Sequence, residues 1–344
     1  MRTTVKLLSL IMLPAALMLA SATALFAEEQ VSMTSANSEI EFYINEDATD
    51  ISIDWGDGTI SNSDAGKKFD GLKFSHQYTS EKLHTIVIRA TNFEWLNCYG
   101  NQLTSLDISK NTALTELFCR ENQLTSLDVS KCTALQRLDC YNNQLTSLDV
   151  SGCISLTNLK YENNPLTSLN VSGCTALTKL DCSNYQLTSL DVSGCTALIT
   201  LWCGNNQLKS LNVSGCMALK ELKCGNNQLT SLDVSKNTAL TYLDCYDNQL
   251  TSLDVNKCTD LTELRCFSNQ LTSLDVSGCA ELKNLYCHNN QLTSVNISGC
   301  TALTELVCWR NQLTSLDVSK NTALKELSCS YNQLTGLEVS KDTA

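Results

Sequence analysis

Hydrophobic and polar positions recur every 21 residues from Phe93 onward, with no insertion. The twelve units begin at Phe93, Leu114, Leu135, Leu156, Leu177, Leu198, Leu219, Leu240, Leu261, Leu282, Leu303 and Leu324. In the unit that begins at Leu114, Leu117 and Cys119 alternate with polar or variable neighbours, and the alternation returns over 124–129. Alternation with a period of two predicts short strands that each bury one face.

A unit of this length is too small to bury a core of its own, because ordering its chain costs more entropy than its few hydrophobic side chains return. Stacked units share their buried faces and backbone hydrogen bonds, so the repeats are stable only as an array. A strict period of 21 residues predicts a solenoid over 93–344. We expect about twelve coils, each with a short parallel strand.

Each unit also contains the pattern L-x-x-L-x-C-x-x-N-x-L, as in Leu114 to Leu124. This pattern resembles the leucine-rich repeat, with cysteine at the third hydrophobic position. The cysteine variant with 21-residue units is similar to the internalin J-like branch of bacterial surface proteins. The resemblance implies a curved, right-handed leucine-rich repeat solenoid of the α/β horseshoe class, mostly β with few helices. It also implies strands on the concave side and a role in binding or adhesion.

The 19 cysteines fall at two positions of the repeat. The first set comprises Cys98, Cys119, Cys140, Cys182, Cys203, Cys224, Cys245, Cys266, Cys287, Cys308 and Cys329. The second set comprises Cys132, Cys153, Cys174, Cys195, Cys216, Cys258, Cys279 and Cys300. We interpret both as ladders of small, buried, unreactive side chains. No C-x-x-C pair is present, so we expect neither a zinc site nor a cofactor.

Asparagine forms another ladder at the end of each strand, where its amide can satisfy the backbone groups of neighbouring turns. An outward aspartate recurs between buried leucine and valine, where nearby cations or lysines are expected to screen the repulsion. The ladder of the first cysteine set and the asparagine ladder are each interrupted once, in consecutive units. Tyr161 replaces a cysteine, Pro165 a glutamine and Tyr185 an asparagine, which predicts an irregularity over 161–185. It is either a binding notch or drift of the repeat.

The outward positions of the predicted strands vary from unit to unit, and most aromatic side chains of the repeats lie there. Tyr246, Phe267, His288 and Trp309 occupy one position in consecutive units. Exposed aromatic clusters mark interaction surfaces, although rings on a strand can also simply cover one another. The predicted ligand-binding residues of the concave face are Trp202, Tyr242, Tyr246, Phe267, Tyr286, His288, Trp309 and Tyr331.

Residues 28–92 do not repeat. The run W-G-D-G-T at 55–59, then H-x-Y at 76–78 and an alternating strand over 85–89, resembles the PKD-type β-sandwich. We expect this segment to form a small sandwich-like domain that caps the first coil. Asp57 and His76 are interpreted as structural rather than catalytic.

Residues 1–27 are typical of an export signal. Arg2 and Lys6 precede a hydrophobic stretch over 7–20, and small residues follow at 22–24. This stretch is too short for a membrane-spanning helix, and no second stretch of about 18 hydrophobic residues follows. We expect a bacterial protein that is secreted or displayed at the cell surface and does not span the membrane.

The chain carries 24 basic and 36 acidic side chains, a formal charge of −12, which argues against nucleic acid as a partner. It has three histidines and no recognisable nucleophile, zinc-protease or phosphate-loop motif, so we do not expect an enzyme. The hypothesis is an exported binding or adhesion protein that holds a protein or glycan. The alternative is a structural spacer or self-assembling surface protein that associates through its C-terminal edge, where the repeats end without a cap.

Overall fold

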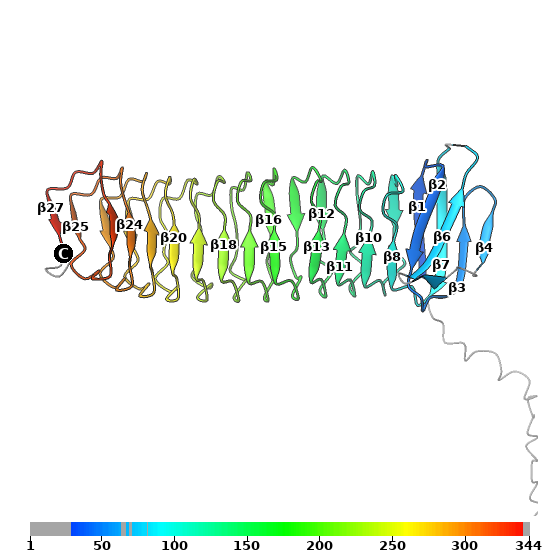
Figure 1. Ribbon diagram of the computed structural model, residues 1–344, viewed down its shortest axis with the longest axis horizontal. Coiled ribbons are helices and arrows are strands. Elements are labelled where there is room, and N and C mark those ends of the chain that lie inside the picture. The colour runs from blue at the N-terminus through cyan, green and yellow to red at the C-terminus, as the bar shows by residue number, and fades with distance from the viewer. Residues whose placement is uncertain (1–28, 63–66, 69–70, 81, 340–344) are drawn as a thin grey trace, which may run out of the picture.

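The computed structural model describes residues 29–62, 67–68, 71–80 and 82–339. The predicted export signal at 1–27 lies outside them. Every regular element over the described residues is a β-strand, and these residues contain no helix. Figure 1 shows a small block of longer strands at one end and a stack of short-stranded coils that extends from it.

The N-terminal block is a sandwich of two antiparallel sheets. Its strands are β1 (Glu29–Ser35), β2 (Glu39–Ile44), β3 (Thr49–Asp54), β4 (Ile60–Asn62), β5 (Lys67–Lys68), β6 (Gly71–Gln77) and β7 (His84–Thr91). One sheet has the order β4-β3-β7-β1 and the other β5-β6-β2. Between them Phe42 packs 5.7 Å from Trp55 and 5.6 Å from Phe74, measured between ring centroids.

Twelve short strands form the side of the solenoid that carries the predicted binding residues. They are β8 (Trp95–Asn97), β10 (Glu116–Phe118), β11 (Arg137–Asp139), β13 (Asn158–Lys160), β15 (Lys179–Asp181), β17 (Thr200–Trp202), β18 (Glu221–Lys223), β19 (Tyr242–Asp244), β20 (Glu263–Arg265), β22 (Asn284–Tyr286), β24 (Glu305–Val307) and β26 (Glu326–Ser328). They run parallel, and leucines one unit apart pair, as Leu117 does with Leu138. We call their outward side the main face.

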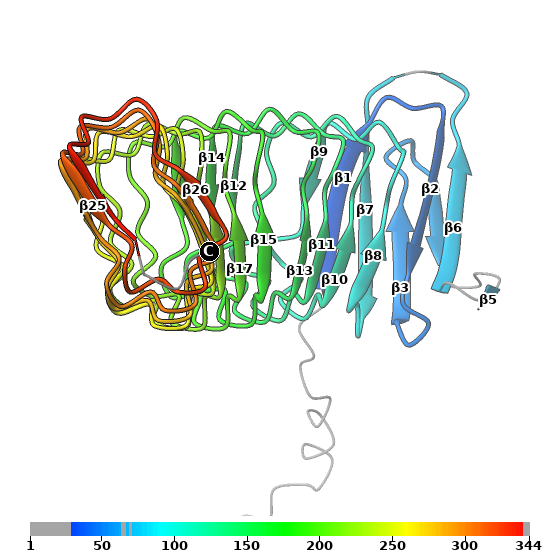
Figure 2. The same ribbon diagram turned by 60° about the vertical axis from the view of Figure 1, so that its left-hand side comes forward.

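A second, interrupted row of strands lies on the opposite side of the coils (Figure 2). Its members are β9 (Ser105–Asp107), β12 (Ser147–Asp149), β14 (Ser168–Asn170), β16 (Ser189–Asp191), β21 (Ser273–Asp275), β23 (Ser294–Asn296), β25 (Ser315–Asp317) and β27 (Gly336–Glu338). Strands on both sides of the solenoid have the same spacing of about 4.8 Å. Neither side is therefore longer than the other along the stack, and nothing bends it towards one side. The coils accordingly follow an axis that is close to straight in the view of Figure 1.

The sandwich covers the first coil on both sides. Strand β1 pairs antiparallel with β9, as Met33 does with Leu106, and β2 pairs antiparallel with β8, as Ile44 does with Leu96. Each sheet of the sandwich therefore continues into one side of the solenoid. The pairing occupies the backbone groups that an open first coil would expose. The sandwich-like cap is confirmed, while its PKD resemblance stays a prediction.

The interior of the solenoid is a continuous column of leucine, valine and cysteine side chains. All 19 cysteines are free thiols, and only Cys329 is less than fully buried. In the second set the thiol faces a carbonyl of the preceding coil, as Cys174 Sγ does with Val150 O at 3.3 Å. Burial raises the pKa of the Cys266 thiol to about 12. The two predicted cysteine ladders are confirmed, and burial keeps their thiols protonated.

The asparagine ladder satisfies the backbone as predicted. The side-chain nitrogen of Asn122 donates to the carbonyls of Cys98 and Cys119, at 3.1 and 2.9 Å, and its oxygen accepts from the Leu103 amide at 2.9 Å. One side chain thus joins two coils and fulfils three buried backbone groups.

The aspartate ladder is stabilised mainly by hydrogen bonds within each turn, to which the expected lysines add, as Lys236 and Lys257 do by lowering the pKa of Asp233. The Asp275 carboxylate accepts hydrogen bonds from the hydroxyl and the backbone amide of Ser277, at 2.7 and 2.9 Å. These bonds, the hydroxyl foremost, lower the pKa of Asp275. Each carboxylate closes a tight turn within its own coil, so the ladder is a local turn motif.

Candidate functional site

The predicted binding residues occupy four positions of the repeat, three of them on the main face and the fourth, that of Tyr331, in the turn beyond β26. Trp202, Tyr242 and Tyr286 belong to strands β17, β19 and β22, and their side chains alternate with buried leucines. Four further rings follow their strands by two residues, beyond a buried cysteine. We call these four, Tyr246, Phe267, His288 and Trp309, the aromatic column.

The aromatic column is one continuous stack. Ring centroids lie 4.9 Å apart between Tyr246 and Phe267, 4.5 Å between Phe267 and His288, and 4.5 Å between His288 and Trp309. The planes differ by 12°, 8° and 18°, respectively, so the rings are close to parallel. The stacking follows from the strand spacing, which sets equivalent side chains about 4.8 Å apart. The predicted clustering of these residues is present in the structure.

The ends of the column are covered as well. Gly225 precedes Tyr246 at the same repeat position, and a Cβ there would lie 2.4 Å from the Tyr246 ring. The Tyr246 ring therefore rests directly on the backbone of Gly225. At the other end the Arg310 guanidinium lies 5.3 Å from the Trp309 ring and 5.6 Å from Tyr331, which is 75% exposed. The column therefore exposes ring edges rather than ring faces.

Basic side chains separate the aromatic rings of the strands. Trp202 lies between the ammonium groups of Lys179 and Lys223, each 4.3 Å from its ring centroid. Its indole nitrogen donates to Glu221 at 3.0 Å, and Lys223 contacts the same carboxylate at 2.8 Å. Cation–π contacts of this kind hold both partners in place.

The same alternation continues one coil further on. The Arg265 guanidinium lies 5.8 Å from the Tyr242 ring and 5.4 Å from the Tyr286 ring. Arg265 Nε donates to Glu263 at 2.6 Å, and the Tyr286 hydroxyl donates to Glu305 at 2.7 Å. The bond to Glu305 is the main cause that raises the pKa of Tyr286 to about 12. We call this second set, Lys179, Trp202, Lys223, Tyr242, Arg265 and Tyr286, the cation row.

The basic members of the cation row were missed in the sequence, although a signal for them was present. Lys223 and Arg265 share the repeat position of Trp202 and Tyr286, with Asp244 between the two cations. Beside them Asp244 is only 6% exposed, and burial raises the pKa of its carboxyl against the opposing effect of both cations. The surface that results is aromatic, carries paired charges of both signs, and is held in place by hydrogen bonds.

Asp57 and His76 do lie together in the sandwich. His76 Nε2 is 2.8 Å from Asp57 Oδ2, and the His76 ring stacks on Trp55 with centroids 4.8 Å apart. The other carboxylate oxygen of Asp57 accepts from the amide and hydroxyl of Thr59. These bonds close the turn after Trp55, in keeping with a structural role.

The described part of the chain holds no group of three or more histidine, cysteine, aspartate or glutamate side chains arranged to bind a metal. It also contains no helix that is long and hydrophobic enough to cross a membrane.

The chain is similar to several known proteins. Residues 112–152, 196–237 and 280–321 match the family model of leucine-rich repeats in two copies. The functional domain of InlJ from Listeria monocytogenes, which includes a cysteine ladder, is 35% identical with a TM-score of 0.52. That alignment covers 73% of this chain and 66% of InlJ, just under two thirds of its length. No curated protein sequence matches significantly.

More distant structures share the fold alone. The internalin inlF from Listeria monocytogenes is 23% identical with a TM-score of 0.52, over 72% of this chain and 80% of that one. The ectodomain of the receptor kinase GASSHO1/SCHENGEN3 from Arabidopsis thaliana, in complex with CASPARIAN STRIP INTEGRITY FACTOR 2, is 22% identical with a TM-score of 0.50. It matches over 72% of this chain and 36% of its own length. The repeats, the thiol ladders and these likenesses together make the chain a leucine-rich repeat protein of the internalin J-like type.

Proposed function

We propose that this is an exported, non-enzymatic binding or adhesion protein that holds a protein partner on its main face. The aromatic column and the cation row supply the contacts. Tryptophan, tyrosine and arginine dominate the energetics of protein interfaces, and here they are gathered on one face of an otherwise acidic chain. Export is inferred from residues 1–27.

The geometry of the rings favours protein over glycan at this face. A sugar binds an aromatic residue through the face of the ring, against which its C–H groups pack. In the aromatic column each inner ring face is covered by the next ring at 4.5 to 4.9 Å. Both faces of Trp202 are covered by lysine. Exposed edges and cations suit the backbone and carboxylates of a protein surface.

The observation that carries this proposal is the preorganised stack. Each ring is immobilised by its neighbours, so binding a partner costs little side-chain entropy. In addition, the glutamates that pin the cation row leave the remaining N–H groups of Lys223 and Arg265 able to bind acidic side chains. The partner is therefore expected to be acidic where it meets the cation row.

The test is a binding array of extracellular proteins and glycans, probed with the exported chain. A variant with Phe267→Ala and Trp309→Ala removes half of the aromatic column, and Phe118→Ala on the same face but far from the column is the matched control. We expect a protein ligand that is retained by the control and lost by the double variant, with unchanged circular dichroism. A glycan ligand with the same dependence, or a protein ligand that binds equally well without the column, would contradict the proposal.

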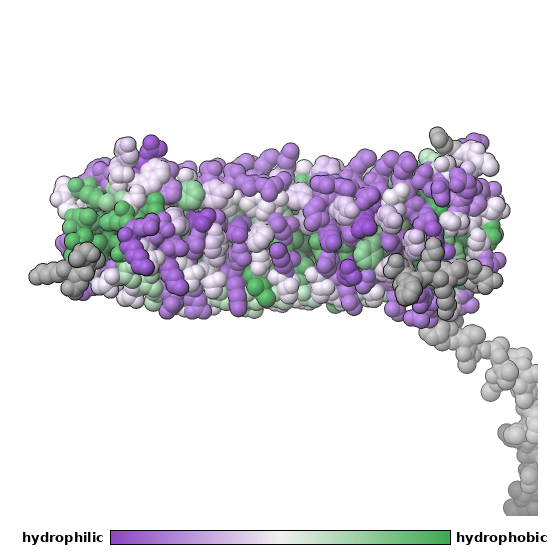
Figure 3. Space-filling model, viewed as in Figure 1, coloured by the Kyte–Doolittle hydropathy of each residue, from purple (hydrophilic) through white to green (hydrophobic). Residues whose placement is uncertain are grey.

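A second candidate function is self-association at the C-terminal coils. Hydrophobic residues gather at that end of the solenoid in Figure 3, and Leu337 and Val339 are 44% and 55% exposed. Exposed strands of this kind pair readily with another chain. Size-exclusion chromatography with light scattering should show oligomers that Leu337→Lys abolishes. A monomer at all concentrations would exclude this candidate.

A further inference from the structure

One pair of neighbouring coils is parted on the main face. Strands β13 and β15 do not pair, although their neighbours pair one unit apart on either side. On the opposite side β14 pairs with both β12 and β16 across the same coils. The two coils are thus joined along one side and open along the other. The predicted irregularity over 161–185 is confirmed.

The opening is caused by Tyr161, which stands where other coils have a cysteine. Its side chain is buried in the coil, only 2% exposed, and its hydroxyl donates to the Asp181 carbonyl at 2.6 Å. In the preceding coil the backbone amide of Cys140 makes the equivalent contact with the Lys160 carbonyl, at 2.8 Å. The large ring replaces a direct backbone bond and holds the coils apart.

The missing asparagine leaves a backbone group without its usual partner. In the preceding coil the Leu145 amide donates to the side chain of Asn164 at 2.9 Å. The equivalent Leu166 amide would need a carboxamide at position 185, where Tyr185 stands instead. Among the described residues it has no hydrogen-bond acceptor. A backbone N–H group without an acceptor from the chain is left able to donate to a molecule bound beside it.

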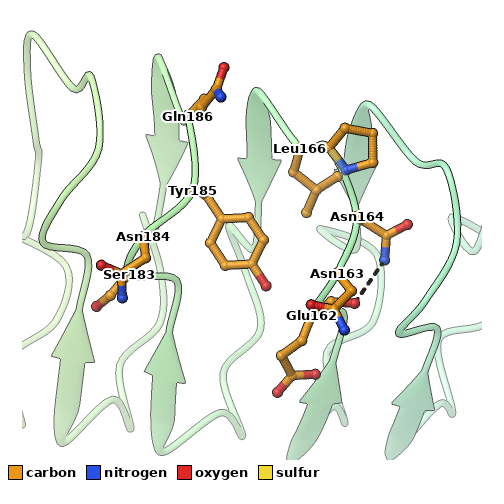
Figure 4. A pocket seen from close by; sticks show the side chains of 9 residues that line it. Glu162, Asn163, Asn164, Leu166, Ser183, Asn184, Tyr185 and Gln186 are labelled. Atoms are coloured by element: carbon orange, nitrogen blue, oxygen red, sulfur yellow. Dashed lines mark hydrogen bonds between the residues drawn. The ribbon is translucent and has the colours of Figure 1, made fainter.

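A pocket of about 410 Å³ opens at this place. Its lining residues are Glu162, Asn163, Asn164, Pro165, Leu166, Ser183, Asn184, Tyr185 and Gln186. Figure 4 shows the Tyr185 ring standing between the two coils, with its hydroxyl directed towards the side of Glu162 and Asn163. We call this pocket the notch. It combines one aromatic ring, one carboxylate and several amides around an unpaired backbone donor.

We propose that the notch binds an N-acetylated amino sugar. The acetamido oxygen accepts a hydrogen bond from the Leu166 amide. It thereby takes the place of the absent asparagine carboxamide. The sugar ring lies against Tyr185, and its hydroxyl groups bind Glu162 and the side-chain amides. A ligand with a carboxamide alone would bind only the Leu166 amide. An N-acetylated sugar also contacts Tyr185, Glu162 and the side-chain amides of the notch. The volume suits a single sugar unit.

The test is titration of the full chain with N-acetylglucosamine and N-acetylgalactosamine, followed by saturation-transfer NMR. We expect saturable binding with a dissociation constant on the order of 1 mM, and at least tenfold weaker binding of glucose and galactose. Tyr185→Asn supplies the missing carboxamide from the chain itself, so it should abolish binding and raise the melting temperature. Glu162→Ala, at an exposed position, should weaken binding at least fivefold without affecting folding.

The matched control is Gln249→Ala, which changes the residue equivalent to Gln186 in a regular coil and should leave sugar binding unchanged. Trp309→Ala should also leave it unchanged, which separates the notch from the proposed partner site on the main face. Equal binding of the parent sugars, persistence of binding in Tyr185→Asn, or no saturable binding at all would overturn the proposal. Binding of an asparagine-containing peptide in place of the sugars would overturn it equally.

Discussion

The side-chain nitrogen of Asn248 donates to the carbonyl of Cys224, 24 residues earlier in the chain, over 3.1 Å. The same nitrogen reaches the Cys245 carbonyl at 3.1 Å, and its oxygen accepts from the Leu229 amide at 3.0 Å. One buried side chain therefore joins adjacent coils where the strand ends. Asn227 and Asn269 donate to the same two carbonyls, whereas the Leu229 amide has only the Asn248 oxygen as acceptor among the described residues.

Replacing Asn248 by alanine should destabilise the solenoid by about 1 to 3 kcal/mol, because it leaves the buried Leu229 amide without an acceptor and removes one hydrogen bond from each of the two carbonyls. Chemical denaturation followed by circular dichroism measures the change. Gln249→Ala removes the exposed neighbouring amide and should stay within about 0.5 kcal/mol of the unmodified chain. Equal effects of the two substitutions would show that the ladder carries no special stability.

The aromatic column should show energetic coupling between its rings. Phe267 and His288 stack at 4.5 Å, and such pairs contribute about 0.5 to 1.5 kcal/mol beyond the area they bury. A double-mutant cycle with Phe267→Ala and His288→Ala is expected to give a coupling free energy in that range. The pair Phe118 and His288 lies in separate coils without contact and should be additive within about 0.5 kcal/mol. Additivity in both pairs would mean that the rings merely lie side by side.

The same histidine should make the column sensitive to acid. Burial between Phe267 and Trp309 lowers the pKa of His288, and its Nδ1 has no hydrogen-bond partner. The unfolded chain then binds a proton more readily than the folded chain. Neutral His288 contributes its full share to the stability of the folded chain above the ordinary histidine pKa of about 6.5. That share is lost as the pH falls through the lower pKa of His288 in the folded chain.

Melting temperatures measured from pH 7.5 to pH 5 should therefore fall more steeply for the unmodified chain than for His288→Phe. The substitution keeps the stack and removes the titrating group. An NMR titration of the imidazole gives the pKa directly. A pKa at or above the ordinary value, or identical pH profiles for both chains, would contradict the assignment.

Much of the fold follows from the sequence because the period is strict. A residue and its equivalent 21 positions later must occupy adjacent strands, which is why Tyr246 and Phe267 were expected to be neighbours and are found 4.9 Å apart. The thiol and asparagine ladders follow from the same regularity. The sequence predicted those contacts of the site that arise from repeating one unit along the stack.

What could not be foreseen depends on contacts outside the period. The antiparallel pairing of Met33 with Leu106 joins a non-repeating segment to the first coil, and no spacing in the sequence indicates it. Likewise, Tyr161 predicted an irregularity, but its one-sided opening depends on the pairing of Leu169 with Leu190 behind it. The role of Lys223 depends on side-chain directions that a repeat position alone does not define.

The thiols provide a test of the whole solenoid, because their reactivity reports how well each coil is covered. Only the thiolate reacts with alkylating reagents, and burial both hides the sulfur and keeps it protonated, as the raised pKa of Cys266 shows. Cys329 alone among the 19 is less than fully buried. Iodoacetamide should therefore modify about one thiol per native chain within minutes, located at Cys329 by mass spectrometry, and all of them after denaturation. Cys329→Ser should abolish the fast reaction, whereas rapid labelling at Cys266 would show that the stack opens in its middle.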